Sequence, residues 1–285
     1  MIVVPAREHA PATRLFVQMC FGEKCSSRPL FILPGGPGAN RTHFTSYRCL
    51  QDDMDLVFHD PRGCGDSDKG SFADYSLENY IEDIEAIMKN LKIEKISLLG
   101  KSYGGLPALG YAIRYPKRLE KLILVATGPS YHFISTAQKK LAEIGSLEQI
   151  RVSQKLWEGQ FSSTKEVEHY FQLMMPLYSK KNISIESSHE ELPFAYEPLN
   201  KGFLTDLRVV DYRNQLSAID CPTLVITGDS DWIFDEMYSR FMNDKIPNAK
   251  LVILKNAGHF IEMDAEEEFY GAVRKFIKDV SCDHR

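Results

Sequence analysis

The sequence Ile-Ser-Leu-Leu-Gly-Lys-Ser-Tyr-Gly-Gly, residues 96–105, places a serine shortly after an apolar run. The run from Ile96 to Leu99 predicts a buried strand, and the G-x-S-x-G spacing around Ser102 predicts a sharp turn from that strand into a helix. Glycines leave room for the backbones that crowd beside such a turn. The free N–H groups at the start of the helix point toward an oxyanion formed at the serine. Ser102 is therefore a candidate nucleophile, but the pattern is common and its meaning depends on the rest of the chain.

The composition is that of a folded globular protein. Of 285 residues, 44% are hydrophobic and 26% are charged, which suits one large domain or a core with an insertion. The net charge is −5 and the basic residues are scattered, so we expect no nucleic-acid partner. Because no signal-peptide pattern and no apolar run of roughly 18 residues is found, we expect a cytoplasmic protein with no membrane partner. The six cysteines lack metal-ligand spacing, which favours free thiols and no metal site.

Short β-rich runs recur along the chain, and several are continuously apolar, as expected for strands buried on both faces of a parallel sheet. They cover residues 15–20, 30–33, 55–58, 96–99, 122–125, 223–227 and 251–254. Helical patterns lie between them. Ser76 is placed to cap one helix, and the spacing of Asp264 and Glu267 predicts the N-cap and third residue of the last one. This alternation predicts an open α/β sheet flanked by helices.

Residues 129–206 differ from the rest because β-rich runs give way to helical patterns. Ser146 with Gln149, and Ser163 with Glu166, have the spacing of helix capping boxes. We expect this segment to be an inserted helical cap over the edge of the sheet, with residues 1–128 and 207–285 forming the α/β core. Most apolar side chains of the cap are expected to pack within it, and a few to face a cleft.

A serine hydroxyl becomes a strong nucleophile when a base takes its proton and a carboxylate orients that base. Three aspartates, Asp229, Asp231 and Asp235, follow the sixth expected strand, and His259 follows the seventh in a glycine-containing loop. Both loops are expected at the same edge of the sheet as Ser102. His259 is the candidate base, whereas the residues themselves leave the choice among the three aspartates open.

The segment Pro-Gly-Gly-Pro-Gly, residues 34–38, follows another expected strand. Its glycines allow the backbone to turn N–H groups inward, so the N–H groups of Gly36 and Tyr103 are the candidate oxyanion hole; the alternative is an ordinary tight turn. Residues 60–68 predict a rigid loop at the same edge. In it we expect Arg62 to brace neighbouring loops, and we assign no base to Cys64.

These segments together resemble the proline iminopeptidase (prolyl aminopeptidase) branch of the α/β-hydrolases. The resemblance rests on residues 34–38, 60–67, 100–105, 228–231 and 258–259 and covers nearly the whole chain, most weakly the cap. It implies the α/β-hydrolase fold, a mostly parallel central sheet flanked by helices with an inserted cap. It also implies Ser102 as nucleophile, Asp231 as orienting acid and His259 as base, with Asp229 as the runner-up acid. One departure is Pro34, which stands where the family usually has a histidine.

The resemblance further implies release of an N-terminal proline or similar residue from short peptides, with no metal or organic cofactor. Such an exopeptidase needs carboxylates near the cap that bind the substrate's ammonium group, for which Glu190, Glu191 and Glu197 are candidates, and Trp232 is a candidate for substrate contact. Two alternatives stay open: an esterase or other acyl hydrolase using the same serine, and a ligand receptor that keeps the fold without catalysis.

Overall fold

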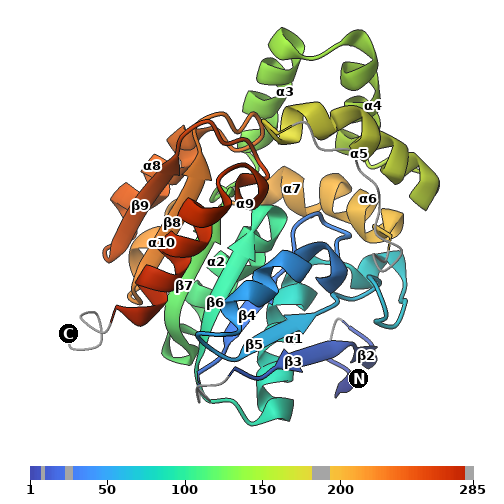
Figure 1. Cartoon of the computed structure of the whole chain (residues 1–285). Helices are drawn as coiled ribbons and strands as arrows, with labels where there is room; N and C mark the ends of the chain where they lie inside the picture. Colours follow the sequence, from blue (N-terminus) through green and yellow to red (C-terminus); the bar gives the residue numbers. More distant parts are fainter. Residues whose placement is uncertain (8–9, 23–27, 182–192, 280–285) are drawn as a thin grey trace.

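The computed structural model describes residues 1–7, 10–22, 28–181 and 193–279. Its main sheet has seven strands in the order β3-β5-β4-β6-β7-β8-β9, of which β3 pairs antiparallel with β5 and the others pair in parallel. This confirms the predicted α/β architecture (Figure 1). The strands are β3 (Val17–Cys20), β4 (Leu30–Leu33), β5 (Leu56–His59), β6 (Ile96–Lys101), β7 (Leu119–Val125), β8 (Thr223–Gly228) and β9 (Ala249–Leu254).

The single strand expected at residues 15–20 is wrong, because the chain changes sheet at Phe16. Residues before it form β2 (Thr13–Leu15), which pairs with β1 (Ile2–Val4) in a separate two-stranded sheet, and residues after it form β3. The backbone of Phe16 bonds instead to the loop after β5: its N–H donates to Ser67 Oγ at 2.9 Å, and its carbonyl accepts from the N–H of Asp60 at 3.0 Å.

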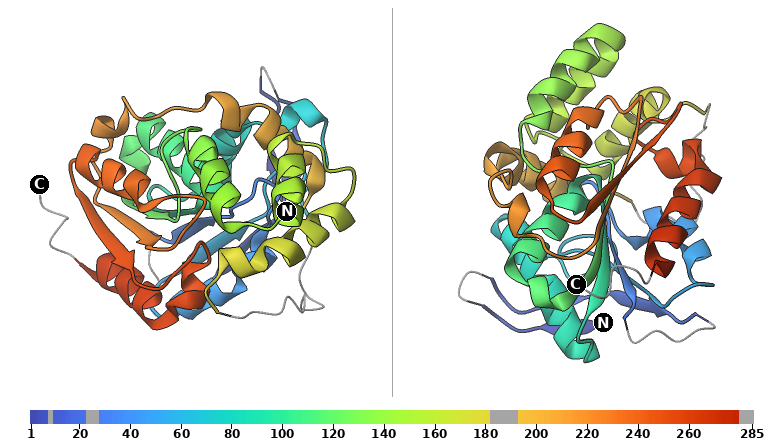
Figure 2. Two further views of the ribbon diagram at one scale, coloured as in Figure 1. Left: turned by 90° about the horizontal axis from the view of Figure 1, so that it is seen from above. Right: turned by 90° about the vertical axis from the view of Figure 1, so that its left-hand side faces the viewer.

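The central strands are buried on both faces, because helices cover the sheet on each side (Figure 2, right). On β4, Phe31 and Leu33 pack into one cluster with the helices α1 (Leu77–Leu91), α2 (Gly105–Arg114) and α8 (Glu236–Lys245). Leu30 and Ile32 face the opposite cluster, with the 3₁₀ segment η1 (Arg41–Leu50) and helix α10 (Glu266–Lys278). Alternate side chains of a strand point to opposite faces, so a continuously apolar run supplies both clusters.

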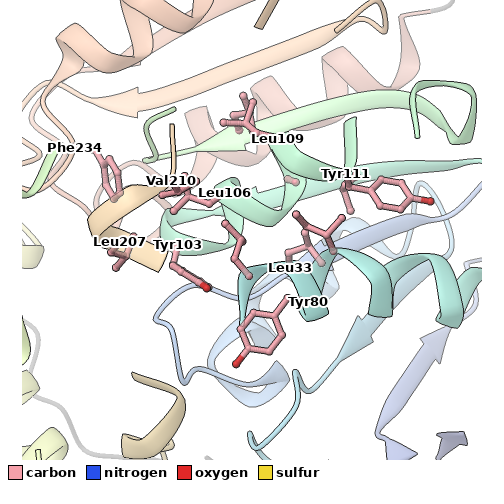
Figure 3. Close-up of a cluster of buried hydrophobic side chains, with 14 of the residues drawn as sticks. Leu33, Tyr80, Tyr103, Leu106, Leu109, Tyr111, Leu207, Val210 and Phe234 are labelled. Carbon is pink, nitrogen blue, oxygen red and sulfur yellow. The ribbon is translucent and has the colours of Figure 1, made fainter. Parts of the chain in front are cut away.

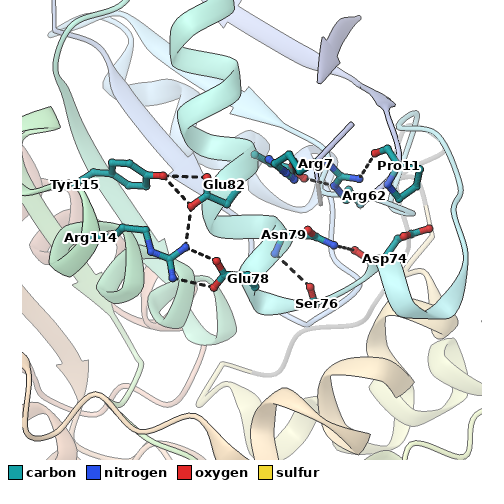
Figure 4. Close-up of polar contacts among 11 residues, drawn as sticks. Arg7, Pro11, Arg62, Asp74, Ser76, Glu78, Asn79, Glu82, Arg114 and Tyr115 are labelled. Atoms are coloured by element: carbon teal, nitrogen blue, oxygen red, sulfur yellow. Dashed lines mark hydrogen bonds and ion pairs between the residues drawn. The ribbon is translucent and has the colours of Figure 1, made fainter. Parts of the chain in front are cut away.

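Helix α2, which starts just after Ser102, is fixed against α1. The Ser76 hydroxyl accepts from the N–H of Asn79 at 3.2 Å and so caps α1 as expected. The Arg114 guanidinium, at the end of α2, donates to Glu78 and Glu82 of α1, each at 2.8 Å (Figure 4). Figure 3 shows part of the buried cluster on this face, in which Tyr80 of α1 and Leu106 of α2 join Leu33 of β4. The position of the serine is thereby tied to the packed core.

Between β7 and β8 the chain is helical. It forms α3 (Phe133–Ile144), α4 (Leu147–Trp157), α5 (Thr164–Tyr178), α6 (Tyr196–Leu204) and α7 (Asp206–Val209). Ser146 and Gln149 make the predicted capping box at α4, and Ser163 Oγ accepts from the N–H of Glu166 at α5 at 3.4 Å. Helices α3, α4 and α5 lie together at one end of the molecule (Figure 1). The boundaries expected for the cap, 129 and 206, stay a prediction.

The remaining short helices are η2 (Phe72–Asp74), η3 (Ser102–Gly104), η4 (Pro116–Arg118), η5 (Leu216–Ala218) and α9 (Ile261–Asp264). The N-cap expected at Asp264 is wrong, since α10 begins at Glu266 with Ala265 at its N-cap. The Asp264 carboxylate instead accepts from the N–H of Gly258 at 2.7 Å and from the Ser179 hydroxyl at 2.5 Å. Within the described ranges, no helix is both long and apolar enough to cross a membrane.

Candidate active site

The segment 100–105, which we call the serine turn, joins β6 to α2 through η3. Ser102 has a φ of +53°, in the left-handed region that few side chains adopt without tertiary support. A Cβ on Gly100 would lie 2.3 Å from the carbonyl oxygen of Gly104, and one on Gly105 would lie 2.3 Å from Thr127 Oγ1. These contacts give the physical reason for the glycines. The same Thr127 hydroxyl donates to the carbonyl of Ser102 at 2.7 Å.

The structure brings Ser102, His259 and Asp231 into one hydrogen-bonded chain. Ser102 Oγ lies 3.0 Å from His259 Nε2, and His259 Nδ1 lies 2.8 Å from Asp231 Oδ2. The imidazole and the carboxylate are both buried. A carboxylate at Nδ1 favours the tautomer with its proton on Nδ1, so Nε2 is free to accept the proton of Ser102. This arrangement suits nucleophilic attack on a carbonyl carbon.

Geometry also separates the three aspartates. Asp231 is 1% exposed and contacts the imidazole. Asp229 is partly exposed and lies 3.6 Å from Lys255 Nζ, whereas Asp235 caps α8 by accepting from the N–H of Met237 at 2.9 Å. Asp229 and Asp235 therefore have structural roles at the surface, and Asp231 is the acid that faces His259.

Gly36 and Tyr103, whose N–H groups are the predicted oxyanion donors, line the same cavity as Ser102. Gly36 has a φ of +111° and lines the same cavity as Tyr103. A Cβ on Gly35 would lie 3.2 Å from Ser102 Cβ, so the glycine loop contacts the serine turn. The Tyr103 ring is buried in the core shown in Figure 3, and its hydroxyl donates to Asp206 Oδ2 at 3.2 Å. Burial raises the pKa of Tyr103, which keeps this hydroxyl neutral.

A cavity of about 670 Å³ opens at Ser102 and extends beneath the helices between β7 and β8. Its walls are mainly apolar, and include Leu156, Trp157, Phe171 and Met175 of α4 and α5. His43 also lines the cavity, and burial lowers its pKa to about 4, so this imidazole is neutral near pH 7. The cavity is of the size that proteins use for small-molecule ligands, roughly 300–1,000 Å³.

The predicted substrate-binding residues are placed differently from one another. Trp232 lines the cavity, is 3% exposed, and its Nε1 has no hydrogen-bond partner among the described residues. Glu197 is exposed in the first turn of α6, and the structure does not bring it to the cavity wall. Glu190 and Glu191 lie outside the described residues. In the described part of the chain, Glu168 of α5 is a carboxylate on the cavity wall that was not predicted from the sequence.

The cavity wall also contains a buried ion pair that was not predicted from the sequence. Lys101 Nζ pairs with Glu262 Oε1, and the two side chains are only 4% and 10% exposed. Lys101 is the first of the two variable residues of the G-x-S-x-G motif, and Glu262 is three residues beyond His259. Their nearness in sequence to the serine and the histidine was a signal that could have drawn attention to them.

The loop at residues 60–68 supports the site without entering it. The Arg62 guanidinium donates to both carboxylate oxygens of Asp83, at 2.6 and 2.8 Å, and to the carbonyl of Pro11 at 3.2 Å (Figure 4). This confirms the bracing role expected for Arg62. Cys64 is fully buried, and burial raises its thiol pKa, which opposes a nucleophilic role. Among the residues with described positions, no cluster of three or more His, Cys, Asp or Glu is arranged to hold a metal ion.

Comparison with known proteins places the chain in a broad group of enzymes. The family model described as "alpha/beta hydrolase fold" matches residues 28–266. A proline iminopeptidase, PfmaB of Pestalotiopsis fici, is 28% identical over 252 residues, covering 85% of this chain and 88% of its own. A cis-3-alkyl-4-alkyloxetan-2-one decarboxylase of Shewanella oneidensis is also 28% identical, covering 88% and 82%. An esterase from Exiguobacterium antarcticum superposes with a TM-score of 0.75 at 20% identity, covering 98% and 99%.

Proposed function

The chain belongs to the α/β-hydrolase family, and from this premise we propose that it is a serine hydrolase acting through an acyl-enzyme on Ser102. The observation that carries the proposal is the chain of contacts from Ser102 Oγ to His259 Nε2, at 3.0 Å, and from His259 Nδ1 to Asp231 Oδ2, at 2.8 Å. Nucleophile, base and orienting acid are within hydrogen-bond reach, which is the arrangement that activates a serine hydroxyl.

In the proposed reaction Ser102 Oγ attacks the substrate carbonyl carbon while His259 Nε2 takes its proton. The oxyanion accepts hydrogen bonds from the backbone N–H groups of Gly36 and Tyr103. The imidazolium, stabilised by Asp231, then protonates the leaving group as the bond to it breaks. Water attacks the acyl-enzyme by the reverse proton path, giving the acid product and restoring Ser102.

For the substrate, we propose an N-terminal proline or a similar residue of a short peptide. The support is the relative named proline iminopeptidase, which covers most of both chains at 28% identity, together with the motifs that resemble this branch. An aminopeptidase needs an acidic group for the substrate's ammonium. Glu168 is suited to this because it lies on the cavity wall from α5 and is exposed to solvent, whereas Glu262 is already paired with Lys101.

Parallel turnover of three chromogenic substrates tests this assignment: a prolyl arylamide, its N-acetylated form and a short-chain aryl ester. Cleavage of the free-amine arylamide, with little cleavage of the acetylated form, supports the aminopeptidase. Glu168→Gln should then raise KM for the free-amine substrate at least tenfold and leave ester cleavage unchanged. Ser102→Ala is the control and should abolish all turnover; a fully active Ser102→Ala enzyme contradicts the mechanism.

A second candidate, an esterase or other small-molecule acyl hydrolase, is favoured by the cavity itself. About 670 Å³ of mainly apolar space is ample for an acyl group larger than a prolyl ring. Ester cleavage without arylamide cleavage, with rates rising from acetyl to octanoyl esters, would favour this candidate. Failure to turn over any of the substrates would favour a receptor.

A further inference from the structure

Lys101 and Glu262 adjoin the reacting residues in sequence and meet in the fold. Lys101 directly precedes Ser102, and Glu262 follows His259 by three residues, in the first turn after the loop. Their ion pair is almost fully buried, with 4% and 10% of the two side chains exposed. The pair therefore connects the end of β6 to α9 inside the cavity wall.

This connection matters because β6 and β9 are not neighbours in the sheet. Strands β7 and β8 lie between them (Figure 1), so no ladder hydrogen bond joins the serine turn to the loop that carries His259. That loop is held on other sides by backbone bonds, from Ser230 N–H to the carbonyl of Ala257 and from Phe260 N–H to the carbonyl of Tyr178, each 2.9 Å long.

Toward the serine strand, the loop and α9 make two polar side-chain links within the described residues. One is the Ser102–His259 hydrogen bond of 3.0 Å, and the other is the Lys101–Glu262 ion pair. The first must break and re-form as the proton moves during the reaction. The ion pair does not take part in that exchange, so it can hold Ser102 Oγ at a fixed distance from His259 Nε2 throughout the reaction.

The surroundings restrict where the pair can lie. The ring of Phe260 lies 4.9 Å from Lys101 Nζ, and Glu262 Oε2 is buried without a hydrogen-bond partner among the described residues. Burial, with a smaller effect of the Glu262 carboxylate, raises the pKa values of Tyr47 and Tyr270. Two charges removed from water in this way lose solvation that their attraction need not restore. A gain in stability therefore does not explain the buried pair, whereas a role in holding the serine turn at a fixed distance from the loop that carries His259 does.

We propose, on the basis of the serine-hydrolase function above, that Lys101 and Glu262 are positioning residues that hold Ser102 Oγ within reach of His259 Nε2. They do so by joining the serine turn to the loop and helix α9 that follow β9 and include His259. The pair therefore affects the rate of attack by Ser102 and not the affinity for the substrate. A misplacement of about 1 Å in a reacting group costs on the order of 100-fold in rate, so loss of the pair should be measurable.

The test uses the full chain and a simple alkyl fluorophosphonate, a reagent that needs no knowledge of the natural substrate. Ser102 Oγ attacks phosphorus, the P–O bond forms, fluoride leaves with the electrons of the P–F bond, and His259 takes the hydroxyl proton. The concentration dependence of labelling separates the maximal rate, kinact, from the apparent affinity, KI. Peptide mapping verifies that the label is on Ser102.

Lys101→Met and Glu262→Gln should each lower kinact by at least tenfold while KI stays within threefold. Lys101→Arg keeps the charge and can re-form the pair, so it should restore kinact to within about threefold of wild type. Each single neutral variant leaves one charge buried and can unfold the protein. The double variant Lys101→Met/Glu262→Met removes both charges and should fold with a Tm close to wild type, yet keep a kinact at least tenfold low.

A matched control removes a lysine–glutamate pair of the same chemistry in the cap. Lys155 and Glu166 are 2.9 Å apart on partly exposed side chains, and Lys155→Met/Glu166→Gln should leave kinact and KI unchanged. A folded Lys101→Met/Glu262→Met protein with wild-type kinact overturns the proposal, and so does a rise in KI without a fall in kinact. If the wild-type chain is not labelled at Ser102, the serine-hydrolase function itself is refuted.

Discussion

Replacing Asp231 by asparagine should disable His259 by reversing its tautomer. Asp231 Oδ1 accepts from the backbone N–H groups of Ile233 and Phe234, at 2.8 and 3.1 Å. These two donors would hold the asparagine carbonyl oxygen at that position and leave the NH₂ group 2.8 Å from His259 Nδ1, where Oδ2 now lies. Two N–H groups cannot face each other, so the imidazole would carry its proton on Nε2.

This change of tautomer prevents the activation of Ser102, whose Oγ is 3.0 Å from His259 Nε2. A protonated Nε2 cannot accept the hydroxyl proton, so kcat/KM for the best of the three substrates should fall by on the order of 10⁴, or about 5 kcal/mol of transition-state stabilisation. Because the two backbone donors keep their acceptor, the unfolding free energy in urea should change by less than about 2 kcal/mol.

Asp229→Asn is the matched control, since Asp229 is the alternative acid in sequence and lies beside Lys255 at 3.6 Å. It should keep kcat/KM within threefold of wild type. A folded Asp231→Asn protein that retains more than a tenth of wild-type kcat/KM would contradict this tautomer mechanism, and so would a larger loss in Asp229→Asn.

Three further predictions concern stability, measured by urea unfolding. Gly100→Ala places a Cβ 2.3 Å from a backbone oxygen and should lower the unfolding free energy by about 1–3 kcal/mol. Gly271 lies in α10 with nothing within 4 Å of the added Cβ, so Gly271→Ala should raise the unfolding free energy by up to about 1 kcal/mol. Equal effects of the two substitutions would contradict this steric explanation. Asp83→Ala leaves the Arg62 guanidinium buried without its carboxylate and should cost about 3–5 kcal/mol, so a loss below 1 kcal/mol would disprove the bracing role. Burial lowers the pKa of His59 to about 4, below the value of about 6.5 in the unfolded chain. The contribution of the neutral, buried imidazole to the unfolding free energy is therefore complete above pH 6.5 and is lost as the pH falls toward 4. Between pH 7 and 4.5, the unfolding free energy of His59→Gln should therefore fall by about 2–3 kcal/mol less than that of the wild type. An equal fall in the two proteins would contradict this role of His59.

Much of the sheet and the serine turn was predictable, because the rules involved are local. Continuously apolar runs such as that of β4 mark strands buried on both faces, and the helix cap at Ser76 depends on residues three positions apart. The N-cap expected at Asp264 failed although its spacing was right. Its carboxylate accepts from Gly258 and Ser179, and the bond to Ser179 is a long-range contact that no local rule contains.

The sequence predicted which types of residue form the candidate site, but it identified only some of the individual residues. Asp229 and Asp231 are two positions apart in one loop, and their sequence neighbourhood cannot show which carboxylate turns inward. Glu197 was a reasonable candidate on charge alone, yet it lies exposed on α6 away from the cavity wall. Glu168 and Glu262 reach the wall because of how α5 and α9 pack.

Local sequence was enough to predict the strand-to-helix turn at Ser102 and the chemistry of its neighbours, because glycine sterics and apolar patterning act over a few residues. The contact of Asp231 with His259, the pairing of Lys101 with Glu262 and the set of side chains that line the cavity depend on how the whole chain folds. Asp231 and His259 are 28 positions apart and Lys101 and Glu262 are 161 apart. Separations of this length are closed by the order of strands and the packing of helices over them, which no local pattern specifies.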